Sequence, residues 1–294
     1  VTNGSLVWQV NDESMGWVHS IAFSPKGHLL ATGGGGQTIR LWRVIDGRLM
    51  KELRGHRDRI RSISFSPDGQ FLVSGGWDDA VRLWRVSDGH LIQTLYQNMF
   101  FVNSVAFSPD GKLLAVGGLG QIGIWQIKNG NLIRIRLLNT MDHVNSVTFS
   151  PNGQLIASGN LLEIKLWKVT GFVPFKTLKT NLKGLSDLTA NDLCFIKFLS
   201  NKHLISFSTK DINVVKLWCV SDNKLIKKLP LGTLSDRFFF WLESVNIPLI
   251  KILRLKSPSH AICMDFLPQL HMLALGFNDG NIRIITFYDK MLQR

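Results

Sequence analysis

The stretch VNSVAFSPDGKLLAVGG (102–118) decides the fold, because the chain repeats it without gaps. The other copies are VHSIAFSPKGHLLATGG (18–34), IRSISFSPDGQFLVSGG (60–76) and VNSVTFSPNGQLIASGN (144–160). Their shared phenylalanine recurs every 42 residues, at Phe23, Phe65, Phe107 and Phe149. A tryptophan motif follows each copy, as in VRLWRV around Trp84. Self-similarity at a fixed period of this length indicates a repeat architecture.

Each repeat is predicted to form four short strands. The first, as in VNSVAF, alternates small or polar residues with apolar ones at the period of two that a strand requires. Ser-Pro-Asp-Gly predicts a turn, because proline presets φ, aspartate bonds the local backbone and glycine adopts conformations that other residues avoid. KLLAVGG is the second strand, the tryptophan motif is the third, and segments such as NLIRIR are the fourth. Sheets of this size bury both faces only by stacking on their neighbours.

This repeat is similar to that of the WD-repeat family of β-propellers, which has the same period and a Gly-His…Trp-Asp pattern. The second copy matches best. It has the residues of the family's hydrogen-bonded tetrad at His56, Ser74, Asp78 and Trp84. The resemblance implies that this tetrad ties a loop, an inner strand and the tryptophan strand together. The FSPDG segments resemble those of bacterial members of the family.

The other repeats depart from the tetrad. Gly36, Leu119 and Leu161 stand at the aspartate position, and Asp279 restores it in the last repeat. The aspartate of the Trp-Asp dipeptide is replaced throughout, as by Arg85 after Trp84. We expect these losses to lower the stability of single blades rather than to change the fold.

The resemblance therefore predicts an all-β fold, a β-propeller of four-stranded antiparallel blades that forms one domain over 1–294. The predicted blades are 17–55, 59–97, 101–139, 143–180 and 193–231, followed by a last blade at 260–287. NGSLVWQV (3–10) matches the fourth-strand segments, so this N-terminal strand is expected to complete the last blade. That fit favours one complete domain.

The aromatic segment SDRFFFWLESVNIPLIKI (235–252) interrupts this regularity. It aligns with the third and fourth strands of another copy, with Trp241 at the tryptophan position, but lacks the first two strands. Two alternatives follow. There are seven blade positions, the sixth being a truncated two-stranded remnant at 234–256, or a six-bladed ring carries 232–256 as an insertion. If the segment is left uncovered, 238–241 becomes a second candidate interface.

Composition narrows the class of protein. With 294 residues, 45% hydrophobic and 19% charged, the chain is expected to be globular rather than disordered. No signal-peptide pattern or apolar run of spanning length is present, and three cysteines without C-x-x-C spacing predict neither a disulfide framework nor a zinc site. These features favour the cytoplasm. The net charge of +13 favours acidic partners.

Apparent chemical motifs have simpler explanations. TGGGGQT (32–38) lies between two predicted strands and lacks the lysine of a phosphate-binding loop. His56, Ser74 and Asp78 are the residue types of a hydrolase triad, but they occupy tetrad positions and imply no oxyanion site. The eight histidines are dispersed. We therefore expect no enzyme activity, no cofactor and no metal.

The loops before the first strand and between the second and third strands open on one face of such a propeller, which we term the top face. We expect a non-catalytic scaffold that binds a protein or peptide partner there, and the positive charge of the chain is compatible with an acidic partner. Large apolar and cationic side chains at these positions are typical of binding hot spots. The candidate residues are Trp17, Arg57, Arg59, Trp77, Phe101, Leu119, His143, Leu161 and His260.

The same residues also have structural explanations, and one alternative function is compatible with the sequence. Some of the candidate side chains could instead pack under neighbouring loops, and the lysines could simply keep strand edges solvated. The alternative function is a basic propeller that binds an acidic polymer, either nucleic acid or an anionic membrane surface. No aromatic–basic nucleic-acid motif supports it, so nucleic acid is disfavoured. No transmembrane segment is expected. The oligomeric state is open, with a monomer expected.

Overall fold

The computed structural model describes 5–11, 14, 16–96, 101–128, 130–140, 143–160, 162–179, 194–208, 214–222, 224–230, 261–267, 272–277 and 279–286. Within these residues the regular structure is all strand apart from one 3₁₀ turn, η2 (Thr170–Phe172). The remnant predicted at 234–256 lies outside the described residues. The chain divides into two compact units, unit 1 (Val1–Thr94 with Ser235–Arg294) and unit 2 (Leu95–Leu234).

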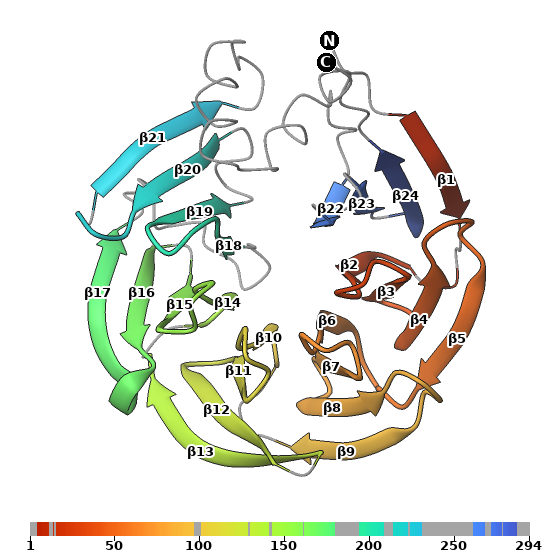
Figure 1. Cartoon of the computed structure of the whole chain (residues 1–294), viewed down its shortest axis with the longest axis horizontal. Coiled ribbons are helices and arrows are strands. Elements are labelled where there is room, and N and C mark those ends of the chain that lie inside the picture. Colours follow the sequence, from red (N-terminus) through yellow and green to blue (C-terminus); the bar gives the residue numbers. More distant parts are fainter. Residues whose placement is uncertain are drawn as a thin grey trace. The chain divides into compact units, whose positions relative to one another are not determined.

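Unit 1 contains three four-stranded antiparallel sheets (Figure 1). The first repeat forms β2 (Val18–Phe23), β3 (Leu29–Gly34), β4 (Thr38–Arg43) and β5 (Leu49–Arg54). The second forms β6 (Ile60–Phe65), β7 (Phe71–Gly76), β8 (Ala80–Arg85) and β9 (Leu91–Tyr96). In the third sheet β1 (Ser5–Asn11) pairs with β24 (Asn281–Thr286), followed by β23 (Met272–Phe277) and β22 (Ala261–Leu267). The N-terminal strand thus completes the last sheet, as predicted.

Unit 2 also contains three such sheets. The third repeat forms β10 (Ser104–Phe107), β11 (Leu113–Gly117), β12 (Gln121–Lys128) and β13 (Asn131–Asn139). The fourth forms β14 (Ser146–Phe149), β15 (Leu155–Gly159), β16 (Glu163–Lys168) and β17 (Val173–Lys179). The fifth forms β18 (Cys194–Phe198), β19 (His203–Ser208), β20 (Val214–Cys219) and β21 (Lys224–Pro230). The described residues thus form four-stranded antiparallel sheets from successive repeats, which are blades of a β-propeller and confirm the predicted all-β propeller fold.

The core of each unit lies between neighbouring sheets. In unit 1, Leu41 and Leu53 of the first repeat pack against Ile63, Phe65 and Trp84 of the second. Second strands are buried on both faces, whereas the fourth strand β5 is mostly exposed, with Leu53 as its one buried residue. This pattern matches the sequence, in which LLATGG has no charged residue and LMKELR has three. Stacking therefore buries the apolar second strands, which a single sheet would leave exposed.

Glycine at the end of the second strand lets the next sheet approach. A Cβ on Gly33 would lie 2.6 Å from Ile63 Cδ1, and one on Gly117 would lie 2.6 Å from Val144 Cγ1. Contacts this short are not tolerated between carbon atoms. The glycines that end the FSPDG copies are therefore required by sheet stacking as well as by the reversal of the chain.

A serine hydroxyl on the first strand joins three pairs of neighbouring sheets within the two units. Within unit 1, Ile63 N donates to Ser20 Oγ at 2.9 Å. Within unit 2, Val147 N donates to Ser104 Oγ at 3.0 Å and Ile196 N donates to Ser146 Oγ at 3.2 Å. The serine shared by the first-strand motifs thus fixes the position of one sheet against the next.

Candidate functional site

Two loops of each repeat meet at one edge of its sheet, as the top-face hypothesis requires. Gly35 N, after the second strand, donates to Trp17 O at 3.0 Å, before the first strand. Trp77 N donates to Arg59 O at the same distance in the next repeat. In unit 2, Asn103 N donates to Gly117 O and Asn145 N donates to Gly159 O, each at 3.0 Å. These backbone bonds give the loop side chains fixed positions.

In unit 1 these loops bring together a cluster of aromatic and cationic side chains, which we call the Trp–Arg strip: Trp17, His19, Arg59, Arg61 and Trp77. The guanidinium carbons of Arg59 and Arg61 lie 5.0 and 5.3 Å from the centroid of the Trp77 ring. Arg61 Nη1 lies 3.3 Å from His19 Nδ1, and the His19 ring meets Trp17 edge to face with centroids 6.0 Å apart. Trp17 is 56% exposed.

The electrostatics of the strip are strongly positive. Burial, followed by the charges of Arg61 and Arg59, lowers the pKa of His19 to about 4, so the imidazole is neutral at neutral pH. Burial and the charge of Arg59 lower the pKa of Arg61 to about 10. Arg61 Nε is buried and has no hydrogen-bond partner among the described residues. The strip therefore holds two guanidinium charges, one of which is largely desolvated.

Beneath the loop that carries Trp77 lies a buried hydrogen-bonded chain. His56 Nδ1 is 2.9 Å from Asp78 Oδ1, His56 Nε2 is 2.7 Å from Ser74 Oγ, and Trp84 Nε1 donates to Ser74 Oγ at 2.9 Å. Arg82 Nη1 donates to Asp78 Oδ2 at 2.7 Å, and Arg57 N donates to the same oxygen at 2.9 Å. The loop, the inner strand and the tryptophan strand are thus joined by side chains.

Charged neighbours surround both titratable groups of this chain. Burial lowers the pKa of His56, although the hydrogen bond and charge of Asp78 oppose it. Burial alone would raise the pKa of Asp78, but the hydrogen bond and charge of His56, with the Arg57 and Arg82 donors, hold it below its usual range. His56 Nδ1 also lies 2.7 Å from Arg82 Nη1, so both ring nitrogens have hydrogen-bond partners within the chain.

Ser74 is therefore not placed as a nucleophile. Its hydroxyl is hydrogen-bonded to His56 Nε2, accepts from Trp84 Nε1 and is fully buried. A catalytic serine needs an accessible oxygen beside an oxyanion site. No group of three His, Cys, Asp or Glu residues able to hold a metal ion occurs among the described residues. The hydrogen-bonded chain instead holds the loop that carries Trp77 against the inner strand and the tryptophan strand.

The indole-to-hydroxyl bond recurs in other sheets. Trp42 Nε1 donates to Thr32 Oγ1 at 2.8 Å in unit 1, and Trp167 Nε1 donates to Ser158 Oγ at 2.9 Å in unit 2. Trp125 Nε1, in contrast, is buried and has no hydrogen-bond partner within the part of the chain that the structure describes. Val116 stands at the position that corresponds to Thr32 and Ser158, and its side chain offers no acceptor.

Unit 2 carries the other described candidates on its loops. Phe101 is 47% exposed and has φ of +66°, a conformation that costs a bulky side chain of the order of 1 kcal/mol. Leu119 and His143 are exposed. Leu161 and His260 lie outside the described residues.

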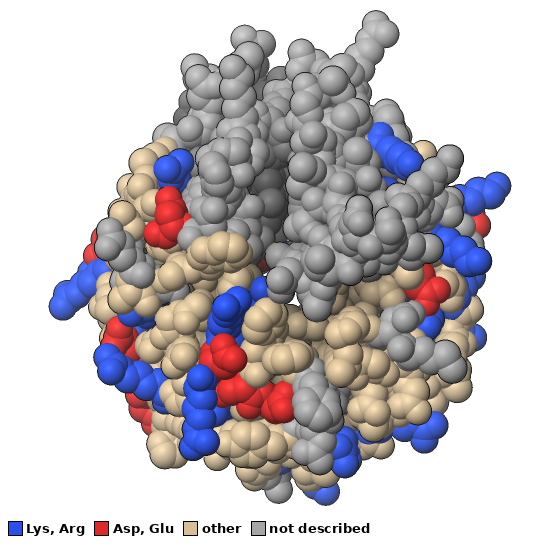
Figure 2. All heavy atoms as spheres, turned by 180° about the vertical axis from the view of Figure 1, so that it is seen from behind, with Lys and Arg blue, Asp and Glu red and all other residues tan. Residues whose placement is uncertain are grey.

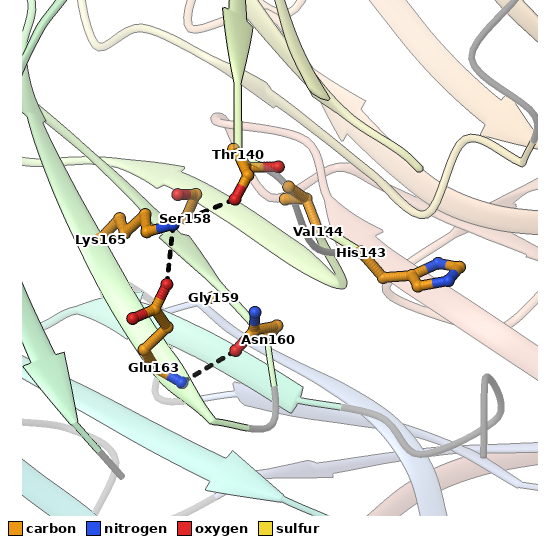
Figure 3. A pocket seen from close by; sticks show the side chains of 8 residues that line it. All are labelled: Thr140, His143, Val144, Ser158, Gly159, Asn160, Glu163 and Lys165. Carbon is orange, nitrogen blue, oxygen red and sulfur yellow. Dashed lines mark hydrogen bonds and ion pairs between the residues drawn. The ribbon is translucent and has the colours of Figure 1, made fainter. Parts of the chain in front are cut away.

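A small pocket in unit 2 surrounds the position that corresponds to the tetrad (Figure 3). Thr140 stands 84 residues after His56, two repeats on, and its side chain is too short to bridge to Ser158. Lys165 Nζ instead donates to Thr140 O at 3.0 Å and pairs with Glu163 Oε1 at 2.7 Å. His143 extends away from that pair (Figure 3). The polar groups of the pocket satisfy one another, which leaves little free for a ligand.

Sequence reasoning selected Trp17, Arg59 and Trp77 but omitted His19 and Arg61 from the candidate residues. His19 and Arg61 occupy equivalent positions 42 residues apart on neighbouring first strands, and asparagine stands there in the next two copies. A histidine and an arginine at a position that holds asparagine in the next two copies are the sequence feature that could have identified these two residues as candidates. Arg57 is exposed on the same loop as Arg59.

The described residues contain no helix long and apolar enough to cross a membrane. The chain matches the family model described as the IFT122 first β-propeller over residues 17–231, which is 215 of its 294 residues. The match runs from the first repeat to the end of β21. The chain therefore belongs to the family of IFT122 first β-propellers, which are propellers of the WD-repeat type.

Proposed function

We propose that the chain is a non-catalytic scaffold that binds a protein or peptide partner through its top-face loops. Propellers of the WD-repeat type generally serve as protein-interaction scaffolds and are generally non-catalytic. The observation that carries the proposal is the Trp–Arg strip, in which the exposed Trp17 contacts His19 and a second tryptophan, Trp77, is covered by two guanidinium groups. Tryptophan and arginine are the residues most enriched in binding hot spots.

The loops of unit 2 extend the proposal to Phe101, Leu119 and His143. Phe101 keeps its ring exposed in a backbone conformation that is costly for its residue type. Such strain persists where surrounding structure holds it, and it concentrates at binding sites. Leu161 and His260 stay candidates by sequence position alone. A cytoplasmic location stays a prediction from cysteine usage.

Affinity purification with the wild-type chain, followed by mass spectrometry, would supply the partner for a quantitative test. Trp77→Ala or Phe101→Ala should then weaken its binding by about 1–3 kcal/mol, because each removes a large side chain from the contact. Tyr96→Ala is the matched control, since Tyr96 is 62% exposed at the end of the fourth strand β9. Unchanged affinity in both loop variants would contradict the proposed surface.

A basic propeller that binds an acidic polymer is the second candidate, and the net charge of +13 is the observation that favours it. On the face seen in Figure 2, however, Lys and Arg side chains are interspersed with Asp and Glu rather than gathered in one field. Salt distinguishes the two candidates. Binding to nucleic acid or anionic vesicles should fall steeply between 50 and 200 mM salt, by roughly 10³-fold or more when several phosphates are neutralised, whereas a contact anchored by Trp77 should not.

A further inference from the structure

The two cations of the Trp–Arg strip have no anionic partner in the described part of the chain. Neither Arg59 nor Arg61 lies within ion-pair distance of a described carboxylate. The nearby Asp78 is occupied by His56, Arg82 and the Arg57 backbone. Asp58 accepts from the backbone N–H of Arg59 at 2.6 Å.

Arg61 differs from an ordinary surface arginine. Its Nη1 faces the neutral His19 ring at 3.3 Å, while its Nε is buried and lacks a partner among the described residues. A desolvated guanidinium beside a second one is electrostatically unfavourable until an anion arrives. The two charges lie over one tryptophan ring, at 5.0 and 5.3 Å from its centroid, which limits their movement. The strip is thus organised for an anion before any ligand is bound.

Charge and shape select the class of anion. Two guanidinium groups match a phosphoryl group, which carries a charge of about −2 and accepts paired hydrogen bonds from arginine forks. A single carboxylate would neutralise only one of them. Trp17, exposed beside His19, provides apolar area for the residues that flank the anion, which a free phosphate ion would not use. We propose that the Trp–Arg strip binds a phosphorylated side chain of a peptide or protein partner. This inference rests on the proposed function of the top-face loops.

The test uses the full chain and three immobilised degenerate peptide libraries, built around a fixed phosphoserine, serine or glutamate. Wild-type protein should be retained at least tenfold more by the phosphoserine library than by the serine library, with glutamate between them. Arg59→Gln and Arg61→Gln should each remove most of this preference. Arg134→Gln should keep it, because Arg134 also covers a tryptophan, at 5.7 Å from the Trp125 centroid, but lies on the fourth strand β13 of unit 2.

Thermal unfolding separates loss of a site from loss of the fold. Arg61→Gln removes a desolvated charge that faces another cation, so its Tm should not fall while its phosphoserine preference does. Arg61→Lys keeps the charge but lacks the planar fork, and should retain glutamate binding better than phosphoserine binding.

The outcomes distinguish the two proposals. Equal retention by all three libraries that is lost in Trp77→Ala would overturn the phosphate inference and leave the peptide-binding function standing. Equal phosphoserine and glutamate retention would make the strip a general acidic-peptide site and also overturn it. Full phosphoserine preference in Arg59→Gln and Arg61→Gln would place the phosphate elsewhere. Retention by none of the libraries, but by phosphatidylserine vesicles, would contradict both proposals.

Discussion

Trp125 shows how one residue type decides whether a buried polar group is satisfied. In the sheets where threonine or serine faces the indole, Trp42 and Trp167 donate their N–H groups at 2.8 and 2.9 Å. Val116 replaces that acceptor in the third repeat, and the indole N–H of Trp125 is left buried without a partner among the described residues. An unsatisfied buried donor costs about 1–3 kcal/mol. The third repeat therefore carries a local defect that the other repeats avoid.

Val116→Thr should stabilise the protein by about 1 kcal/mol, because threonine is nearly isosteric with valine and supplies the missing acceptor. Thr32 already plays this role for Trp42. Chemical denaturation monitored by circular dichroism measures the change.

Val73→Thr is the matched control, since Val73 is also fully buried on a second strand but precedes the acceptor position by one residue. It should lose about 1–3 kcal/mol by burying a hydroxyl without its indole. Equal destabilisation by both substitutions would contradict the account of Trp125.

His19 makes the free energy of unfolding depend on pH. Its pKa is about 4 in the folded chain and 6.5 in the unfolded one, because burial and two neighbouring arginines disfavour the imidazolium. Between these values the unfolded chain binds the proton and the folded chain does not. This contribution to stability is therefore unchanged above pH 6.5 and falls as the pH drops toward 4, by up to about 3 kcal/mol.

His19→Asn removes this titration, and asparagine stands at the equivalent position of the third and fourth repeats. Urea denaturation at several pH values between 7 and 4 should give curves for wild type and variant that diverge across this window. Carboxylates titrate in both proteins and cancel in the difference. Parallel curves would show that His19 is not held neutral by Arg61 and Arg59.

At the scale of the element, the first strand does two tasks with one motif. Its apolar residues fill the space between sheets, and its serine accepts a backbone N–H from the next sheet. The register between neighbouring sheets thus depends on a single hydroxyl as well as on packing.

Ser104→Ala should destabilise the protein by about 1–2 kcal/mol, because it leaves the buried N–H of Val147 without its acceptor. Ser64→Ala is the control on a first strand, since the Ser64 hydroxyl contacts only the adjacent Phe65 carbonyl at 3.5 Å. Its effect should stay below about 0.5 kcal/mol. Chemical denaturation of the two variants compares them, and equal losses would refute a specific role for the bond between sheets.

Strands and turns were the most predictable part of the fold. Ser66, Asp68 and Gly69 form the expected turn, with Ser66 Oγ donating to Asp68 Oδ1 at 2.5 Å and Gly69 at φ +72°. Less was predictable where the local sequence is not repeated. The 3₁₀ turn η2, with Gly171 at φ +77°, stands where other repeats place an Asp-Gly or Asn-Gly turn, and no motif announced it.

The candidate site was only partly predictable, for a physical reason. Trp17, Arg59 and Trp77 follow from loop positions within single repeats. His19 and Arg61 come into contact only because two sheets stack. A single sequence does not directly show which residues of two stacked strands will face each other. The pocket beside Thr140 was not predicted. It arises because Thr140 stands at the position that His56 holds two repeats earlier, and the smaller side chain leaves space. A search for motifs detects residues that are present, not the space left by one that is absent.

At the scale of the whole molecule, some of the positive charge is buried or paired. Arg82 and Lys216 are buried, Lys165 is paired with Glu163, and Arg85 is paired with Asp88 on the surface. What is left mixes with acidic side chains on the face seen in Figure 2. Such a field speeds encounters with acidic partners in general. Choice among partners is left to short-range contacts such as those of the Trp–Arg strip.

The pairing of β1 with β24 determines when this sheet can be completed during synthesis. Asn11 pairs with Asn281, which lies 270 positions later in the chain (Figure 1). A ribosome adding about 5–20 residues per second needs roughly 14 to 54 s to cross that interval. The sheets β2–β5 and β6–β9 come from contiguous segments and need no such delay. Within unit 1, β1 is translated first among the described strands but can pair only after β24 has been made. Completion of the sheet that contains β1 is therefore limited by the time needed for translation.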